Sequence, residues 1–185
     1  MKENRKIAVI SIFGAVVAVL QIVATFINFG SFPITLTLVP IIVAGAMFGV
    51  GVGAIMGTVF GAIVALMVIT GADPSGAAML AMHPFITVSV CVLKGTMCGA
   101  AGAFVYRLLK DKNQKLAIIL AAAITPIVNT GTLALAIILF FGGAFATLIA
   151  LFVTVNFLIE LVIDVLLAPG LLGLINRYSK RMMTD

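Results

Sequence analysis

The sequence predicts an all-α membrane protein with six transmembrane helices and both termini on the cytoplasmic side. Its 185 residues are 63% hydrophobic and only 9% charged, whereas about a quarter of the residues of a soluble domain are charged. Its apolar runs reach the roughly 20 residues that a helix needs to cross a bilayer. Lysine and arginine gather in three clusters separated by even numbers of these runs. We therefore expect residues 1–185 to form a single integral-membrane domain.

Glycine, proline and polar residues divide the apolar sequence into six spans. These are Ile7 to Ile27, two spans between Ile34 and Thr70, Pro84 to Leu109, Leu116 to Phe141, and Leu148 to Ile175. As one helix, the stretch from Ile34 to Thr70 would exceed about 50 Å, against a hydrocarbon core of about 30 Å. It must fold back, and we expect Gly49 to Gly53 to supply the turn. Pro169 and Gly170 are expected to kink or break the last helix near its end.

The basic residues set the orientation, because lysine and arginine are enriched in cytoplasmic loops. With six spans, ten of the eleven basic residues fall on one side: Lys2, Arg5, Lys6, Arg107, Lys110, Lys112, Lys115, Arg177, Lys180 and Arg181. We assign this side to the cytoplasm. The opposite side carries three short, glycine-containing connections, Asn28 to Pro33, Gly71 to His83 and Gly142 to Thr147. They can act as lids over an outward-facing pocket or as simple tight turns.

Three charged residues lie deep within the predicted spans. They are Lys94 on the fourth span and Glu160 and Asp164 on the sixth. A charge within a span costs about 2.5 to 3.5 kcal/mol and usually faces a bundle interior or an aqueous cavity. At about 1.5 Å per residue, Lys94 and Glu160 both lie roughly 15 Å below the outer ends of their helices, so they can meet near the midplane. Asn156 lies four residues before Glu160 and extends this polar stripe on one helix face.

The fifth span has a similar polar stripe, formed by Thr125, Asn129 and Thr132. Two interpretations of these groups stay open. Lys94 and Glu160 can form a buried ion pair that fixes helix register, or they can belong to a ligand pocket whose outer half includes Asn129 and Asn156. Asp164 is either a helix-packing residue or an element that couples to a partner.

Small residues indicate close helix packing, the main packing device in lipid. They recur every fourth position on the third span, at Gly49, Gly53, Gly57, Gly61 and Ala65, and on the fourth span, at Gly95, Gly99 and Ala103. The first span carries two such pairs, Ser11 with Ala15 and Gly14 with Ala18. We expect the first span to offer one of these pairs to another protein.

Several chemistries have no signature in the sequence. It contains no Gly-x-x-x-x-Gly-Lys-Ser/Thr loop, no His-Glu-x-x-His motif and no Ser-His-Asp set. Cys91, Cys98 and a single histidine make a poor zinc set, so we interpret both cysteines as packing residues. We expect no enzyme activity, no metal and no cofactor.

Four stretches carry a family resemblance. They are Ile34 to Pro40 before the glycine break, Lys94-Gly95, Pro126 to Gly131, and Asn156 to Glu160. In their order and spacing the chain resembles the substrate-binding (S) components of energy-coupling factor (ECF) transporters, in the branch that binds pantothenate, folate, riboflavin or cobalamin. The resemblance covers nearly the whole chain and implies a six-helix protein of a bacterial plasma membrane.

The resemblance implies a receptor for a water-soluble vitamin. Its partners would be a transmembrane coupling subunit and two ATPase subunits, which supply ATP hydrolysis. The vitamin would bind near the outer face, beneath the loop between the first two spans, so Asn28 and Thr35 join Lys94, Asn129, Asn156 and Glu160 as candidate binding residues. His83, at the outer mouth, is either a ligand contact or a loop cap. The family's helix-one contact motif is matched approximately by Ser11/Ala15 or Gly14/Ala18.

The polar inventory favours pantothenate among the vitamins. Lys94 suits a carboxylate, and the amide and carboxylate side chains suit amide and hydroxyl groups. The absence of tryptophan weighs against large stacked rings. Two other functions stay open: a stand-alone proton-coupled transporter that uses Glu160 and Asp164, and a structural subunit whose buried charges lock the fold.

Overall fold

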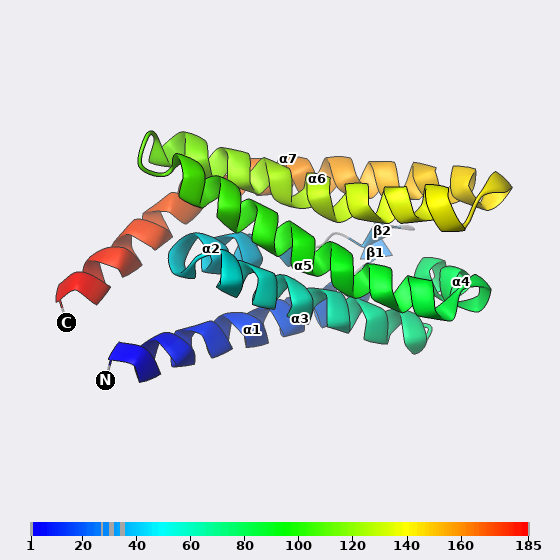
Figure 1. The fold of residues 1–185 in the computed structure, drawn as a ribbon, viewed down its shortest axis with the longest axis horizontal. Coiled ribbons are helices and arrows are strands. Elements are labelled where there is room, and N and C mark those ends of the chain that lie inside the picture. Colours follow the sequence, from blue (N-terminus) through cyan, green and yellow to red (C-terminus); the bar gives the residue numbers. More distant parts are fainter. Residues whose placement is uncertain (1, 27, 30–31, 34–35, 185) are drawn as a thin grey trace.

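The computed structural model describes the backbone of residues 2–26, 28–29, 32–33 and 36–184, and the side chains of residues 4, 7–24, 36–142 and 157–177. Helices make up almost all of it (Figure 1), which confirms the all-α prediction. In chain order these are α1 (Lys2–Phe26), α2 (Leu38–Phe48), α3 (Val50–Ile69), α4 (Pro74–Met82), α5 (Pro84–Leu109), α6 (Gln114–Phe140) and α7 (Gly143–Thr184). Between α1 and α2, β1 (Asn28–Phe29) and β2 (Phe32–Pro33) pair as a small antiparallel hairpin.

Six apolar helices correspond to the six predicted spans. Within the described ranges, five of them, α1, α3, α5, α6 and α7, are long and apolar enough to cross a bilayer. The sixth, α2, is apolar but has only 11 residues. At 1.5 Å per residue it is about 16 Å long, roughly half of the hydrocarbon core. The second span is therefore shorter than predicted, because the chain before it runs through the hairpin.

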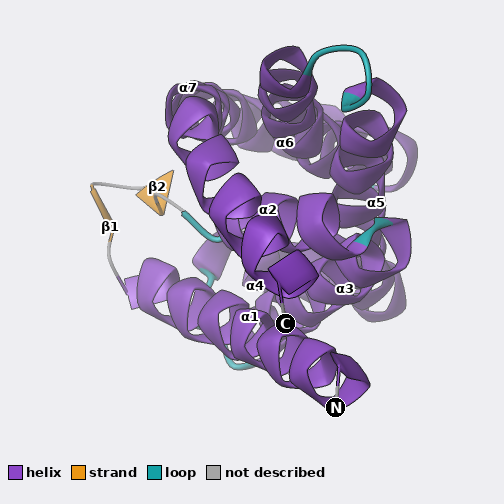
Figure 2. Cartoon of the chain, turned by 90° about the vertical axis from the view of Figure 1, so that its left-hand side faces the viewer, coloured by secondary structure: helices purple, strands orange, loops and turns teal. Residues whose placement is uncertain are grey.

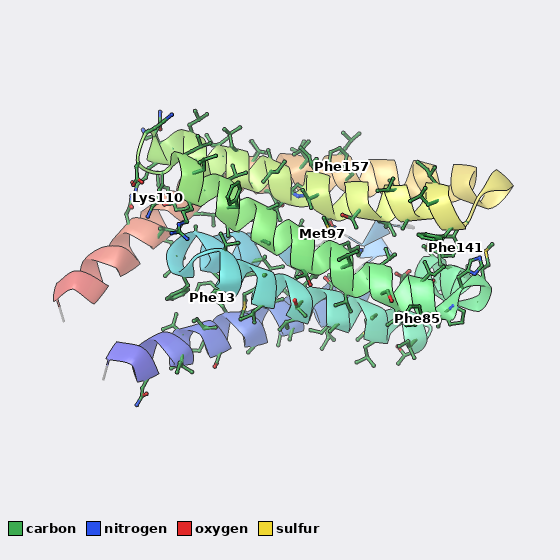
Figure 3. The ribbon with its side chains drawn as sticks, viewed as in Figure 1. Phe13, Phe85, Met97, Lys110, Phe141 and Phe157 are labelled. Atoms are coloured by element: carbon green, nitrogen blue, oxygen red, sulfur yellow. The ribbon has the colours of Figure 1, made fainter. Side chains whose placement is uncertain are left out.

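The helices form a bundle with its two termini at one end (Figure 1). In this view α3 and α5 cross the middle, α6 and α7 lie on one side of them, and α1 lies on the other. The turn between α5 and α6, marked by Lys110, lies at the same end as the termini (Figure 3). The three basic clusters thus share one end of the bundle, as the six-span prediction requires. We refer to this end as the inner end.

Two predicted turns are tighter than expected. The turn between α2 and α3 needs only Gly49, whose φ of 99° lies in the region that favours glycine. Gly51 and Gly53, predicted as part of this turn, lie within α3. The connection predicted from Gly142 to Thr147 is also shorter, because α7 begins at Gly143.

The connection from Gly71 to His83 contains the helix α4, which was not predicted. Asp73 caps this helix, since its carboxylate accepts hydrogen bonds from the backbone N–H groups of Ser75 and Gly76, both at 3.1 Å. Met79 on α4 packs with Ile137 and Phe141 from the outer end of α6. This connection is therefore a packed helix that covers the outer ends of its neighbours.

The last helix, α7, continues through Pro169 without a break. Its final part nevertheless turns away from α6 (Figure 1), which agrees with the predicted kink. The main apolar core runs along the bundle, from Ile42, Ile118 and Leu172 near the inner end to Val64 and Val68 in the outer part of α3. Cys91 and Cys98 are buried free thiols, consistent with packing roles.

Candidate functional site

The interior contains polar side chains from five parts of the chain. Those that are buried in the described residues are Gln21, Thr37, Thr87, Thr125, Asn129, Glu160 and Asp164. Burying a polar group costs free energy unless a partner satisfies it. These buried polar residues are therefore the candidates for contacts with a substrate.

The packing of α3 against α5 fixes the first side of this region. A Cβ atom added at Gly57 would collide with the backbone oxygen of Gly95, and one added at Gly95 would collide with that of Gly57. Gly53 and Gly99 face each other in the same way. This confirms that the predicted small-residue seam lies inside the molecule, except that Gly49 belongs to the turn. Because the backbones touch, the register of the two helices has little freedom.

A hydrogen bond of 2.8 Å between the hydroxyl groups of Thr58 and Thr96 adds a polar contact to this seam. Lys94 lies just beyond it on α5, with its side chain partly buried. The Nζ atom of Lys94 lies over the ring of Phe60 on α3, 5.9 Å from the ring centroid. This distance is within the range of a cation–π interaction. Among the described side chains Lys94 forms no ion pair, and the contact that its ammonium makes is the one with Phe60.

The acidic residues lie on α7. Glu160 and Asp164, one turn apart, are 2% and 1% exposed and interact electrostatically with each other. Both carboxyl groups lie near enough to Cys98 of α5 to affect its thiol electrostatically, and Lys94 lies one turn before Cys98 on the same helix. Neither carboxylate oxygen of Asp164 has a hydrogen-bond partner in the described part of the chain.

Asn129 approaches the same region from α6. The hydroxyl of Thr125, which donates to the Ala121 carbonyl at 2.8 Å, lies against Gly102 of α5. Because α5 and α6 run antiparallel, one turn outward from this contact brings Asn129 level with Cys98. Asn129 is 5% exposed, and its side-chain oxygen has no hydrogen-bond partner among the described residues. This oxygen retains its capacity to accept a hydrogen bond from a ligand.

The hairpin and the start of α2 form the remaining side. Seen from the inner end, the hairpin lies between α7 and α1 (Figure 2), and β2 contacts both helices. Thr37 precedes α2 and is fully buried, and its hydroxyl makes no hydrogen bond within the described structure. Since α2 spans only the inner half of the bundle, its first residues begin at depth. Free N–H groups at a helix N-terminus favour negative charge.

The other predicted site residues are placed as follows. His83 is exposed at the outer end, where its ring packs edge-on against Phe141 with centroids 5.4 Å apart. Its carbonyl accepts the Thr87 hydroxyl at 2.9 Å, so it joins α4 to α5 and is not brought together with the interior groups. Thr35 and the side chains of Asn28 and Asn156 lie outside the described residues.

The two candidate contact pairs on α1 face different ways. Ser11 and Ala15 are exposed. Gly14 faces α3, since a Cβ atom at this position would lie 3.7 Å from Cε of Met56, and Ala18 is partly buried. Of the two pairs, Ser11 with Ala15 is therefore the one that a partner can reach.

Sequence reasoning missed three residues of this region: Gln21, Thr37 and Phe60. Gln21 had a usable signal, because it is a lone amide within an otherwise apolar first span. Thr37 belongs to the stretch from Ile34 to Pro40, which carries the family resemblance, but the sequence assigned no function to this residue. Phe60 is one of 13 phenylalanines, and nothing in the sequence distinguishes it from the rest.

The sequence matches the family described as "ECF transporter, substrate-specific component" over residues 5–172. The chain belongs to this family. A search of curated proteins found no match. As an ECF S component, the chain is a multi-pass membrane protein and the substrate-specific subunit of a transporter. The members of this family bind substrates and are not a catalytic family. ECF S components bind small molecules and work with a membrane coupling subunit and ATPases.

Proposed function

We propose that this S component is a receptor for a water-soluble vitamin, with pantothenate as the substrate that fits its polar groups best. The observation that carries this proposal is that buried Glu160 and Asp164 of α7 and Lys94 of α5 all lie near Cys98, with buried Asn129 of α6 at the same level. Pantothenate has one carboxylate for an ammonium, and one amide and two hydroxyls for amide and carboxylate side chains. Asn28, Thr35 and Asn156 complete the proposed binding set, and His83 is left at its margin.

The energy for transport would come from partners. The chain has no phosphate-binding loop of its own, so two cytoplasmic ATPases and a coupling subunit would drive release of the vitamin into a bacterial cell. The basic inner end would face the cytoplasm. The exposed pair Ser11 and Ala15 would meet the coupling subunit, because small side chains let helices approach closely in lipid. The receptor itself would need no cofactor or metal.

Two measurements test the receptor. Native mass spectrometry of the detergent-solubilised protein should show a co-purified molecule with the mass of pantothenate. Calorimetric titration of the emptied protein should then give saturable binding, and Lys94→Ala should weaken it at least thirtyfold, about 2 kcal/mol, by removing a charge-assisted contact. A bound mass of another vitamin would refute pantothenate and keep the receptor.

The docking surface needs its own test. Ala15→Trp should leave pantothenate binding unchanged and abolish co-purification with the coupling subunit, because a bulky ring would block close helix contact. Asn4→Trp, on an exposed residue two turns before Ser11, serves as the matched control. Retained assembly in Ala15→Trp would refute this surface.

One alternative has a specific observation in its favour. Glu160 and Asp164 are buried together within α7, and acidic residues in spans often carry protons in transporters. A proton-coupled transporter predicts pantothenate uptake by proteoliposomes that contain this chain alone, driven by a pH gradient. The receptor predicts uptake only when the coupling subunit, the ATPases and ATP are also present.

A further inference from the structure

The contact between Lys94 and Phe60 places a charged ammonium group over a residue of the apolar core. Phe60 is 3% exposed and belongs to the main apolar core, yet its ring lies under the Lys94 ammonium. The glycine seam explains how this arises. Gly57 and Gly61, which flank Phe60 on α3, lie directly against the backbone of α5, so the ring is held beside the helix that carries Lys94.

The ring stabilises the ammonium without neutralising it. An aromatic face attracts a cation through its quadrupole but supplies no negative charge. It also covers the ammonium from one side, and an ammonium has three donors. Among the described side chains none forms an ion pair with Lys94, so its ammonium keeps donors that the ring does not use. A carboxylate satisfies both the charge and the donors, through hydrogen bonds stronger than neutral ones.

We propose that Phe60 is a positioning residue for Lys94, and that the pair selects substrates that carry a carboxylate. This inference rests on the proposed receptor function, because it concerns the same site. It adds a residue to that site and defines the class of substrate by its charge. In the resting state the ring holds the ammonium in place, and the substrate carboxylate binds the donors that the ring leaves free.

The first part of the test needs no ligand. Lysine amines are converted to ¹³C-dimethylamines and their resonances recorded by NMR, with Lys94→Arg used to assign the Lys94 signal. Phe60 should shift this signal upfield by its ring current, and Phe60→Leu should remove the shift. Met56→Leu is the matched control, since Met56 is equally buried on α3 but contacts Gly14. A Lys94 signal that does not respond to Phe60→Leu overturns the inference.

The second part compares pantothenate with panthenol, which carries an alcohol in place of the carboxylate. The unaltered protein should bind pantothenate at least thirtyfold more tightly, and Lys94→Met should abolish this preference. Phe60→Leu should weaken pantothenate binding about tenfold and change panthenol binding less than twofold. Phe60→Tyr, which keeps an aromatic face, should retain the preference. If Phe60 only fills space, Phe60→Leu weakens both ligands equally, and the inference is wrong.

The outcomes separate this inference from the receptor proposal. If only a neutral vitamin binds, the receptor stands and the selection of carboxylates is refuted. If a different carboxylate vitamin binds and moves the Lys94 signal, the inference stands and pantothenate is refuted. If no vitamin binds in calorimetry or native mass spectrometry, both proposals fall, even where the ring-current shift is present.

Discussion

The two sides of the bundle are held together by different kinds of contact. Between α3 and α5, glycines such as Gly57 and Gly95 bring backbone against backbone. On α7, no atom of the described residues lies within 4 Å of a Cβ position at Gly170 or Gly173. The same residue type thus builds a tight seam on one side and packs against nothing on the other.

The polar groups of the two sides also differ in their hydrogen bonding. Next to the seam, Thr58 and Thr96 satisfy each other, and Lys94 has an aromatic partner. On α7, Asp164 is fully buried with neither carboxylate oxygen hydrogen-bonded within the described structure. The two threonine hydroxyls of the seam thus satisfy each other, whereas Asp164 on α7 keeps hydrogen-bonding capacity that no described group uses. A receptor needs both, a fixed frame and groups available to a ligand.

The largest effect is expected where the seam is tightest. Gly57→Ala places a methyl group against the Gly95 backbone, which cannot move aside as a side chain can. Forcing extra volume into a packed interior costs about 1 to 3 kcal/mol, and this site belongs at the upper end. We expect the free energy of unfolding, measured by SDS titration in mixed micelles, to fall by about 3 kcal/mol. A loss below about 0.5 kcal/mol would show that the seam is not a rigid contact.

Replacing Asp164 with an apolar residue is expected to raise the free energy of unfolding, whereas Gly57→Ala lowers it. Replacing buried charged pairs with well-packed apolar residues is often neutral or stabilising by about 1 to 4 kcal/mol, and a buried carboxylate without hydrogen bonds costs free energy in the same way. Asp164→Leu should therefore raise the free energy of unfolding by about 1 to 2 kcal/mol in the same titration. Asp164→Asn, which keeps the shape, is the control. Destabilisation by both variants would mean that the charge locks the fold, as the structural-subunit interpretation requires.

The sequence predicted the frame of this molecule better than its details. Hydrophobic runs and lysine placement identify six spans and a common end for the termini, because lipid leaves few other ways to satisfy a backbone. The repeat of small residues predicted the α3–α5 seam for the same reason. The short α2 escaped prediction because it depends on how the hairpin and the neighbouring helices fill space. The helix α4 was missed although Asp73 at its N-cap and Pro74 at its first position are local start signals.

The candidate site shows the same limit. Lys94, Glu160 and Asp164 stand out because charges are rare in spans, and in the structure all three lie near Cys98. Their pairing could not be predicted: helix spacing allows Lys94 to reach Glu160, whereas its ammonium lies on Phe60. That preference depends on the exact approach of α3 to α5. Phe60 carries no mark in the sequence, so only tertiary packing identifies it.

A smaller effect is expected from the hydroxyl pair of the seam. Hydrogen bonds between membrane helices contribute about 0.6 kcal/mol on average and at most about 1.7. Thr58 and Thr96, 2.8 Å apart in a fixed register, should lie toward the upper part of this range. A double-mutant cycle with Thr58→Val and Thr96→Val should give a coupling energy of about 1 kcal/mol. A coupling energy of zero would show that glycine contacts alone hold α3 to α5.

The smallest change in the free energy of unfolding is expected for Gly170→Ala, on the open side of the bundle. A methyl group at this position meets no described atom within 4 Å, and the residue lies inside a continuous helix. Glycine is a poorer helix former than alanine, so Gly170→Ala should leave the free energy of unfolding unchanged or raise it by about 0.5 kcal/mol. The same substitution at Gly57 is expected to cost several times more. Equal decreases in the free energy of unfolding for Gly170→Ala and Gly57→Ala would mean that glycine is equally tightly packed on α7 and α3. The difference between a backbone-packed side and an open side would then not hold.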